Sequence, residues 1–246
     1  MKNILALAGL LAGLSFNAQA DSQVILYAPD GSQTAVVSHA QTLSQLLASP
    51  ALKDRSWWPG TVIAEPLATA AAQQHYQQTL ARLQSWAASE EGERAAAINS
   101  VLQQLKAVRV TGRQFVSLDP DWIRLRPEAN RRLEGEYSLY TLRRPTSVTL
   151  AGAIAGSGKV VWQPGRDTRD YLAGHARLSG AERNVVTVIA PDGSTQEAPV
   201  AYWNHRHVEV APGSIIYLGF SSWALPAEYR DLNQHIISVL THRIPD

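Results

Sequence analysis

The residues best able to perform acid, base or metal chemistry occur in two short motifs. Asp119-Pro120-Asp121 carries two carboxylates, and a pair of carboxylates that flanks a glycosidic bond can hydrolyse it. Two acids around a proline are more typical of a turn and a helix cap. His205 and His207 would share one face of a strand and could hold an ion there, but no third ligand is near in sequence. Neither motif therefore predicts an enzyme or a metal site.

Motifs for a nucleophile or a bound phosphate are not indicated either. The chain has no Gly-x-Ser-x-Gly elbow and no Walker motif. Gly156-Ser157-Gly158-Lys159 lacks the upstream glycine and the following helix of a phosphate-binding loop, so we expect a hairpin loop. The chain has no cysteine, which excludes thiolate chemistry, disulfides and a lipid attached to a cysteine. We expect no catalytic residue and no cofactor.

Tryptophan is the residue type that suggests a ligand. The chain contains Trp57, Trp58, Trp86, Trp122, Trp162, Trp203 and Trp223. An exposed indole can stack on the apolar face of a sugar ring, whereas a buried indole belongs to the core. Trp86 falls at helical spacing and is expected to be buried. Trp57 and Trp58 cannot both point inward from an extended segment, so this pair is a candidate carbohydrate site.

The N-terminus and the charge balance restrict the location and the partners. Met1-Lys2-Asn3, the apolar run 4–16 and Ala18-Gln19-Ala20 are typical of a secretory signal peptide over residues 1–20, cleaved after Ala20. The remaining chain has balanced charge, so we expect no nucleic acid partner, because such proteins carry a basic excess. No later segment approaches the about 20 apolar residues that span a bilayer, and no integral membrane segment is expected.

One order of elements occurs twice along the chain: strand, strand, short helix beginning at a threonine, and closing strand entered through glycine. The first pass has strands at 24–27, 35–37 and 135–140 and a helix from Thr42. The second has strands at 148–152, 159–161, 185–189 and 213–217 and a helix from Thr168. Asp-Gly turns occur at Asp30-Gly31 and Asp192-Gly193, at different points of the two passes. This order predicts two small α+β modules, over 21–144 and 145–225.

Two other stretches have helical periodicity. Apolar residues recur at helical spacing from Pro66, and again after the break at Glu90-Glu91-Gly92-Glu93, which predicts a helical hairpin inserted into the first module at about 66–107. Residues 226–246 predict an amphipathic C-terminal helix. This helix either docks on the second module or is offered to a partner, and the sequence leaves both possibilities open.

Five segments of the chain resemble the GfcC-like family of periplasmic proteins for group 4 capsule biosynthesis, which are encoded with an outer-membrane polysaccharide exporter. The segments are Asp54-Arg55-Ser56-Trp57-Trp58-Pro59-Gly60, Val110-Thr111-Gly112-Arg113, Leu118-Asp119-Pro120-Asp121, Tyr137-Ser138-Leu139-Tyr140-Thr141 and Ile237-Ser238-Val239-Leu240-Thr241-His242-Arg243-Ile244-Pro245-Asp246. The resemblance covers essentially the whole mature chain. It implies two β-grasp-like domains related to those in the exporter's periplasmic part, the first carrying the helical hairpin, and a C-terminal amphipathic helix.

The resemblance also implies a function and a site. The expected function is that of a non-catalytic periplasmic factor in capsule or exopolysaccharide assembly or export. Its expected partners are the capsular polysaccharide, the outer-membrane polysaccharide export protein, or both. The family's cleft arginine corresponds to Arg113, whose planar guanidinium could hold a carboxylate or sugar hydroxyls near Trp57 and Trp58. Asp119 and Asp121 complete the candidate site, although either acid could simply pair with Arg113.

Two other functions are kept as alternatives. A pure adaptor would meet the exporter through its β-grasp edges and its C-terminal helix without touching sugar. An exposed Trp57 or Trp58 beside Arg113 would argue against that adaptor. A glycan-processing enzyme would need two carboxyl groups about 5 to 9.5 Å apart across a cleft. No acid pair outside a turn is recognisable in the sequence, so this alternative is the weakest.

Overall fold

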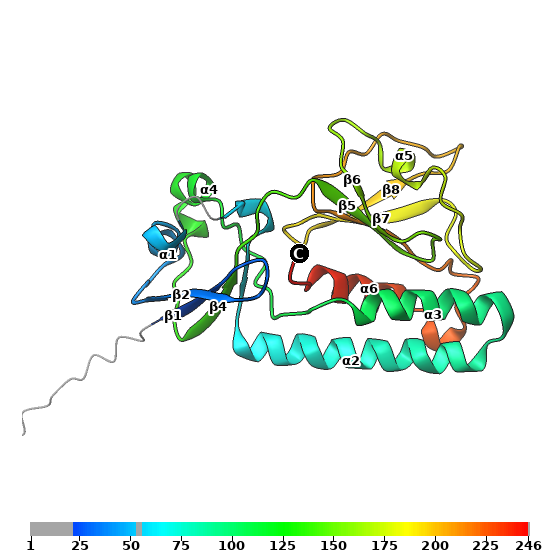
Figure 1. Ribbon diagram of the computed structural model, residues 1–246, viewed down its shortest axis with the longest axis horizontal. Helices are drawn as coiled ribbons and strands as arrows, with labels where there is room; N and C mark the ends of the chain where they lie inside the picture. Colours follow the sequence, from blue (N-terminus) through cyan, green and yellow to red (C-terminus); the bar gives the residue numbers. More distant parts are fainter. Residues whose placement is uncertain (1–21, 53–55, 246) are drawn as a thin grey trace, which may run out of the picture.

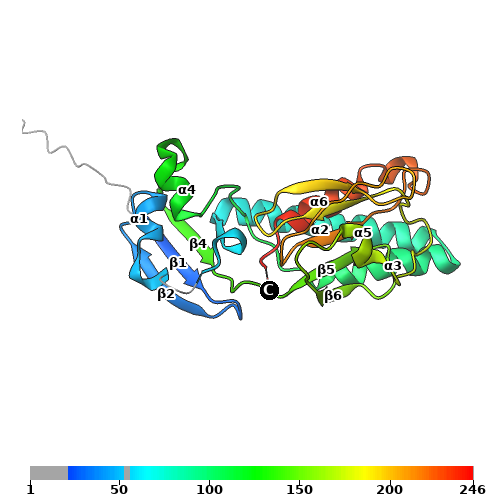
Figure 2. The ribbon, with the colours of Figure 1, turned by 90° about the horizontal axis from the view of Figure 1, so that it is seen from above.

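The protein forms two lobes that lie side by side, and the long helix α2 (Pro66–Ser89) runs from the first lobe along the second (Figure 1; Figure 2). The computed structural model describes residues 22–52 and 56–245, so the predicted signal peptide and its cleavage site at Ala20 lie outside the described residues. Each lobe contains one sheet with helices packed on it. The α+β class and the two-module arrangement are thereby confirmed.

The first sheet has the strand order β2-β1-β4-β3. Its strands are β1 (Gln23–Tyr27), β2 (Gln33–Ser38), β3 (Val62–Ala64) and β4 (Glu136–Tyr140). β1 is antiparallel to β2 and parallel to β4. The helices α1 (Leu43–Leu47) and α4 (Pro120–Leu125) cover the face that carries Val24, Leu26 and Leu139, and together they form the first core.

The second sheet repeats this arrangement with one more strand, in the order β6-β5-β9-β7-β8. Its strands are β5 (Ser147–Gly152), β6 (Gly158–Val161), β7 (Val185–Ile189), β8 (Thr195–Pro199) and β9 (Ile215–Leu218). As in the first sheet, the opening hairpin is followed by a short helix, α5 (Thr168–Leu172), and the closing strand β9 is parallel to β5. A parallel closing strand beside the opening strand is the arrangement expected of β-grasp-like domains.

The two Asp-Gly turns have the same local chemistry although they occupy different places in the repeat. Asp30 accepts hydrogen bonds from the backbone N–H and the hydroxyl of Ser32, at 2.9 and 2.6 Å. Asp192 accepts the same two bonds from Ser194, at 2.9 and 2.7 Å. The intervening glycines have φ of 83° and 87°, a region that side chains disfavour. The first turn joins β1 to β2, and the second joins β7 to β8.

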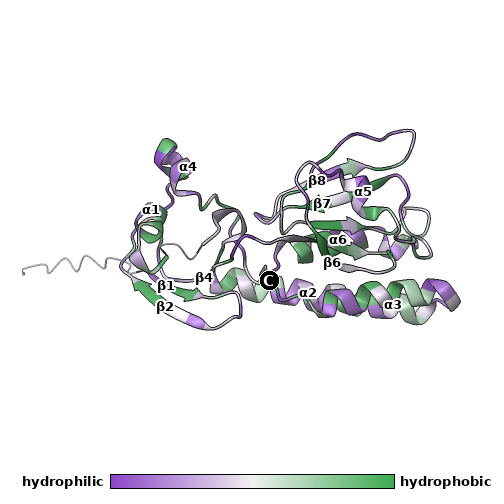
Figure 3. Cartoon of the chain, turned by 45° about the horizontal axis from the view of Figure 1, so that its top comes forward, coloured by the Kyte–Doolittle hydropathy of each residue, from purple (hydrophilic) through white to green (hydrophobic). Residues whose placement is uncertain are grey.

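The helical hairpin packs on the second sheet, not on the module into which it is inserted. It consists of α2 and α3 (Gly92–Lys106), and the break between them falls at the predicted place. Its buried residues, including Trp86, Ile98 and Leu102, belong to one core with β5, β7 and β9. Hydrophobic and hydrophilic residues alternate along both helices (Figure 3), as expected of helices with one buried face. α5 lies on the opposite face of the sheet (Figure 1).

The C-terminal helix α6 (Leu232–Thr241) is docked beside α2 and α3, which answers the question left open by the sequence. Leu232, Ile236, Val239 and Leu240 are buried in the second core. The α-helix begins later than residue 226, because residues 227–229 form a separate 3-10 turn.

The helices of the described residues, 22–52 and 56–245, were also compared with the length and hydropathy of a membrane span. None of them is both long enough and apolar enough to cross a membrane.

Candidate functional site

A cavity of about 400 Å³ lies between the first lobe and the turn that joins β7 to β8. The first lobe supplies Trp58, Arg113, Phe115 and Asp119, and the turn supplies Asp192 and Ser194. We call this cavity the Arg113 cleft. Residues that are far apart in sequence meet here because the chain returning from α3 crosses between the two lobes.

Gly112 brings the chain close enough to α2 to set the position of Arg113. A side chain at Gly112 would place its Cβ 2.1 Å from the backbone nitrogen of Thr69, a distance that atoms cannot adopt. The Gly112 N–H donates to the Thr69 hydroxyl at 2.9 Å, and its carbonyl accepts from the N–H of Glu65 at 3.2 Å. Arg113 itself forms an isolated β-bridge with Ala64. The backbone before the arginine is therefore held at both of its polar groups.

The Arg113 guanidinium is buried but incompletely paired. The residue is 5% exposed, and its Nε and Nη2 atoms have no hydrogen-bond partner among the described residues. Burial and the nearby Arg243 lower the pKa of Arg113 to about 10, while Asp192 acts in the opposite direction. The group therefore remains charged at neutral pH. A buried donor without an acceptor costs about 1–3 kcal/mol, and both unpaired atoms are shielded from solvent.

The turn between β7 and β8 closes over Arg113 because Gly193 has no side chain. A Cβ at this position would lie 2.5 Å from Nη1 of Arg113 and 2.8 Å from the Phe115 ring. Nη1 is thus covered by the turn. The unpaired atoms, Nε and Nη2, are the two adjacent donors on the other edge of the guanidinium. Two adjacent donors of this kind can bind both oxygens of a carboxylate.

The structure gathers some of the sequence-predicted site residues and separates others. Trp58 lines the cleft with Arg113 and Asp119 and is half-buried against the first core. Trp57 does not line this cavity, and its ring lies against Gly60. Asp121 also lies outside the cavity and forms an exposed ion pair with Arg124 at 2.9 Å. Within the described residues neither Asp119 nor Asp121 is paired with Arg113.

The two carboxylates at the cleft, Asp119 and Asp192, already accept hydrogen bonds from backbone N–H groups. Asp119 is the N-cap of α4 and accepts hydrogen bonds from the N–H groups of Asp121 and Trp122, at 2.9 and 3.4 Å. The turn and cap interpretation of this motif is therefore correct. Asp192 accepts the bonds of its own turn from Ser194. Their positions are explained by local structure, and no reaction step is derived from them.

The histidine pair does not form one site. Residues 203–207 are not a strand, so His205 and His207 do not share a strand face. His205 hydrogen-bonds Asp167, and His207 lies 3.4 Å from Glu209. Burial raises the pKa of Asp167, but the bonds from His205 and from backbone N–H groups outweigh burial and leave the pKa below its usual value. Among the described residues no group of three His, Asp or Glu could hold a metal ion.

Sequence reasoning missed residues that line the Arg113 cleft and an exposed aromatic ring elsewhere on the surface. Phe115 and Asp192 line the Arg113 cleft, and only the fold brings Asp192 to it. The sequence predicted one exposed ring in the Trp57-Trp58 pair, whereas both are partly buried and Trp203 is far more exposed than either. The polar segment around Trp203, which lacks strand or helix periodicity, was the available signal for that exposure.

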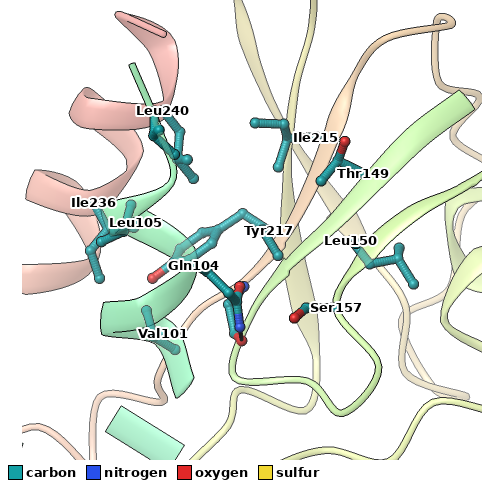
Figure 4. A pocket seen from close by; sticks show the side chains of 14 residues that line it. Val101, Gln104, Leu105, Thr149, Leu150, Ser157, Ile215, Tyr217, Ile236 and Leu240 are labelled. Carbon is teal, nitrogen blue, oxygen red and sulfur yellow. Dashed lines mark hydrogen bonds between the residues drawn. The ribbon is translucent and has the colours of Figure 1, made fainter. Parts of the chain in front are cut away.

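A second, more apolar cavity of about 220 Å³ lies inside the second lobe, between the sheet and the helices α3 and α6 (Figure 4). Val101 and Leu105 from α3, Ile215 and Tyr217 from β9, and Ile236 from α6 line it. The Gln104 side chain spans from α3 to the sheet, accepting from the Gly152 N–H at 2.7 Å and donating to its carbonyl at 3.0 Å. This cavity is part of the interface that fixes the helices on the sheet.

Comparison with known proteins gives matches over both lobes. The family described as "Capsule biosynthesis GfcC, N-terminal" matches residues 20–144, and the family described as "Capsule biosynthesis GfcC C-terminal" matches residues 156–245. The chain is also similar to the "Uncharacterized protein YjbG" of Escherichia coli (strain K12), with 45% identity over 222 residues that cover 90% of each chain. Because the two family matches together cover most of the chain, the protein belongs to the GfcC family of capsule biosynthesis proteins.

Proposed function

We propose that the protein is a non-catalytic periplasmic factor in the assembly or export of a surface polysaccharide, and that it binds the glycan in the Arg113 cleft. Membership of a capsule biosynthesis family supports this function. The predicted signal peptide supports the location. The observation that carries the site is the buried Arg113 guanidinium, whose Nε and Nη2 donors have no partner among the described residues.

The cleft combines groups that suit a sugar. Arg113 lines the cavity, and a guanidinium can bind a carboxylate or two neighbouring hydroxyls through two adjacent donors. Trp58, on the wall of the same cavity, offers an aromatic surface for the apolar face of a sugar ring. The acids Asp119 and Asp192 are exposed at the same cavity and can accept hydrogen bonds from sugar hydroxyls. Together these residues supply donors, acceptors and an apolar surface.

Binding of the polysaccharide purified from the producing cells tests this proposal by calorimetry. The protein used is the mature chain from Asp21. Arg113→Met keeps the length of the side chain but removes its donors, and we expect affinity to fall roughly ten- to a hundredfold, as for hydrogen bonds to a charged group. Arg124→Met is the matched control, because Arg124 is exposed and lies outside the cleft.

The fold should survive the Arg113→Met change, since a buried charge without a full set of partners contributes little to stability. Circular dichroism checks this point. A folded wild-type protein that does not bind the polysaccharide would contradict the proposal. Equal affinities of the Arg113→Met and Arg124→Met variants would leave glycan binding possible but would move it out of the cleft.

A second candidate function, an adaptor of the exporter without sugar contact, is favoured by one surface. Over β1 and β2, the described residues place no helix on the outer face of the first sheet, which carries Ile25, Tyr27 and Val36. Tyr27 stacks on Tyr140 there, with ring centroids 5.0 Å apart. Co-purification of the exporter with the wild-type protein but not with a Val36→Glu variant, in the absence of polysaccharide binding, would favour the adaptor.

A further inference from the structure

A separate cavity of about 560 Å³ lies at the other end of the β7–β8 hairpin from the Arg113 cleft. Its walls come from α5, from residues 177–184 before β7, and from residues 200–203 after β8. β7 has five residues, so the two cavities are separated by about 17 Å of strand at 3.3 Å per residue. A long polymer could therefore contact both, but a single sugar could not.

Two neighbouring aromatic rings are exposed at this cavity. Tyr202 is 92% exposed and Trp203 is 75% exposed. Within the described residues neither ring has an aromatic or cationic side chain stacked on it, whereas the exposed Trp223 has Arg94 at 5.7 Å and Trp122 has Arg126 at 3.9 Å. Neighbouring aromatic rings exposed at a cavity are a common feature of ligand-binding sites. Flat rings of this kind are suited to the apolar faces of sugars.

The same cavity has an excess of positive charge. Arg169, Arg177 and Arg183 line it together with one acid, Asp170. Within the described residues none of the three guanidinium groups forms an ion pair. The acid next in sequence to Arg183, Glu182, is already used, because its carboxylate accepts the N–H groups of residues 183 and 184 at 2.7 and 2.9 Å. Among the residues that the structure describes, Arg177 donates only to the backbone carbonyl of Arg183, at 3.4 Å. Guanidinium groups without an acid partner favour a ligand that carries carboxylates.

The segment that carries the two rings is held in place before any ligand binds. Val200 donates its N–H to the Asn184 carbonyl at 2.9 Å, and the Asn204 side chain donates to the same carbonyl at 3.2 Å. Asn204 also accepts from the Ala201 N–H at 3.0 Å. These bonds fix both ends of the segment to the start of β7. A surface that is already ordered loses less conformational entropy on binding.

We propose that this cavity is a second saccharide site, and that it binds a segment of acidic polysaccharide. Tyr202 and Trp203 stack on the sugar rings, while Arg169, Arg177 and Arg183 bind the carboxylates of uronic acid units. This inference rests on the proposed function for its ligand class, a polysaccharide. It adds a site at the opposite end of the hairpin and a requirement for negative charge, neither of which follows from the Arg113 cleft.

Calorimetric titration of the mature protein with oligogalacturonate, a short uronic acid polymer, tests the site. Maltoheptaose serves as the neutral sugar and poly-glutamate as an acidic polymer without sugar rings. We expect saturable binding of oligogalacturonate that weakens at higher salt, because exposed charges are screened. Trp203→Ala and Arg183→Gln should each weaken binding roughly tenfold, the effect of losing a central contact. Trp223→Ala is the matched control, since Trp223 is 70% exposed and lies outside this cavity.

Several outcomes would overturn the proposal. These are no binding of oligogalacturonate, equal loss in Trp203→Ala and Trp223→Ala, equal binding of maltoheptaose, or equal binding of poly-glutamate. Arg113→Met, titrated with the same probe, separates this inference from the proposed function. Loss of binding in Arg113→Met but not in Trp203→Ala would sink the second site and leave the cleft. The reverse pattern would support the second site and count against the cleft.

Discussion

The two sheets are built in the same order, but among the residues that the structure describes only the second has helices on both faces. In the second sheet all four residues of β9 are buried, because α5 lies on one face and α2, α3 and α6 lie on the other. In the first sheet β1 alternates between buried residues and partly exposed ones, such as Ile25. The difference comes from the helical hairpin. It is inserted in the sequence of the first module but packs on the sheet of the second and completes its core. A repeated element order therefore does not imply repeated burial.

Truncation of Trp86, in the hairpin that covers the second sheet, should have the largest effect on the stability of the protein. Trp86 is fully buried between α2 and the C-terminal segment, with Phe220 at 4.8 Å and Tyr229 at 5.7 Å between ring centroids. Trp86→Ala should lower the free energy of unfolding by about 3–5 kcal/mol, the usual cost of a large cavity in a core. Urea denaturation measures this loss.

Trp122→Ala is the control for that measurement, because Trp122 is exposed in the first lobe. A loss of less than about 1 kcal/mol in Trp86→Ala, below the usual range for buried aromatics, would mean that the hairpin is not an essential cover of the second sheet.

Acidification should distinguish the short helices of the two modules. Asp167 caps α5, whereas the uncharged Thr42 caps α1. The folded state holds the pKa of Asp167 below its ordinary value of 3.8, despite burial, through bonds from His205 and backbone N–H groups. A lowered folded pKa means that the carboxylate stabilises the protein fully above about pH 4. This contribution is lost as pH falls through the lower folded pKa.

We therefore expect Asp167→Asn to lower the free energy of unfolding at neutral pH. The gap between the free energies of unfolding of the variant and the wild type should narrow as the pH falls below 4. Denaturation curves between pH 7 and pH 3 measure the gap. Asp170→Asn is the matched control, because Asp170 is exposed on the same helix. A gap that stays constant over this pH range would show that the Asp167 charge does not stabilise α5.

A change on the open face of the first sheet should have the smallest effect. Val36 is 42% exposed and lies opposite Ile25 across the β1–β2 hairpin. Val36→Thr keeps the branched shape favoured in strands, so the free energy of unfolding should change by no more than about 0.5 kcal/mol. Denaturation of Val148→Thr, at a fully buried position of β5, provides the contrast. Similar losses in the two variants would mean that the first face is covered after all.

Local structure was largely predictable from the sequence. Helix starts at Thr42 and Pro66, the break before α3 and the turn at Asp30-Gly31 all follow from neighbouring residues. The Asp119 cap was predictable for the same reason. The candidate site was less accessible, because the sequence named Trp58 and Arg113 but could not show that Asp192 reaches the same cleft.

The sequence by itself determined most of the strands, helices and turns, since periodicity, caps and turn residues act over a few positions, but it did not predict β3 or β8. It also determined the balanced charge and the absence of cysteine. Only the tertiary structure decided that the hairpin covers the second sheet and that the C-terminal helix is docked. It likewise decided that the guanidinium of Arg113 is buried without a full set of partners and that Tyr202 and Trp203 are exposed. These outcomes depend on contacts between segments that are distant in sequence, and no local pattern encodes which of them meet.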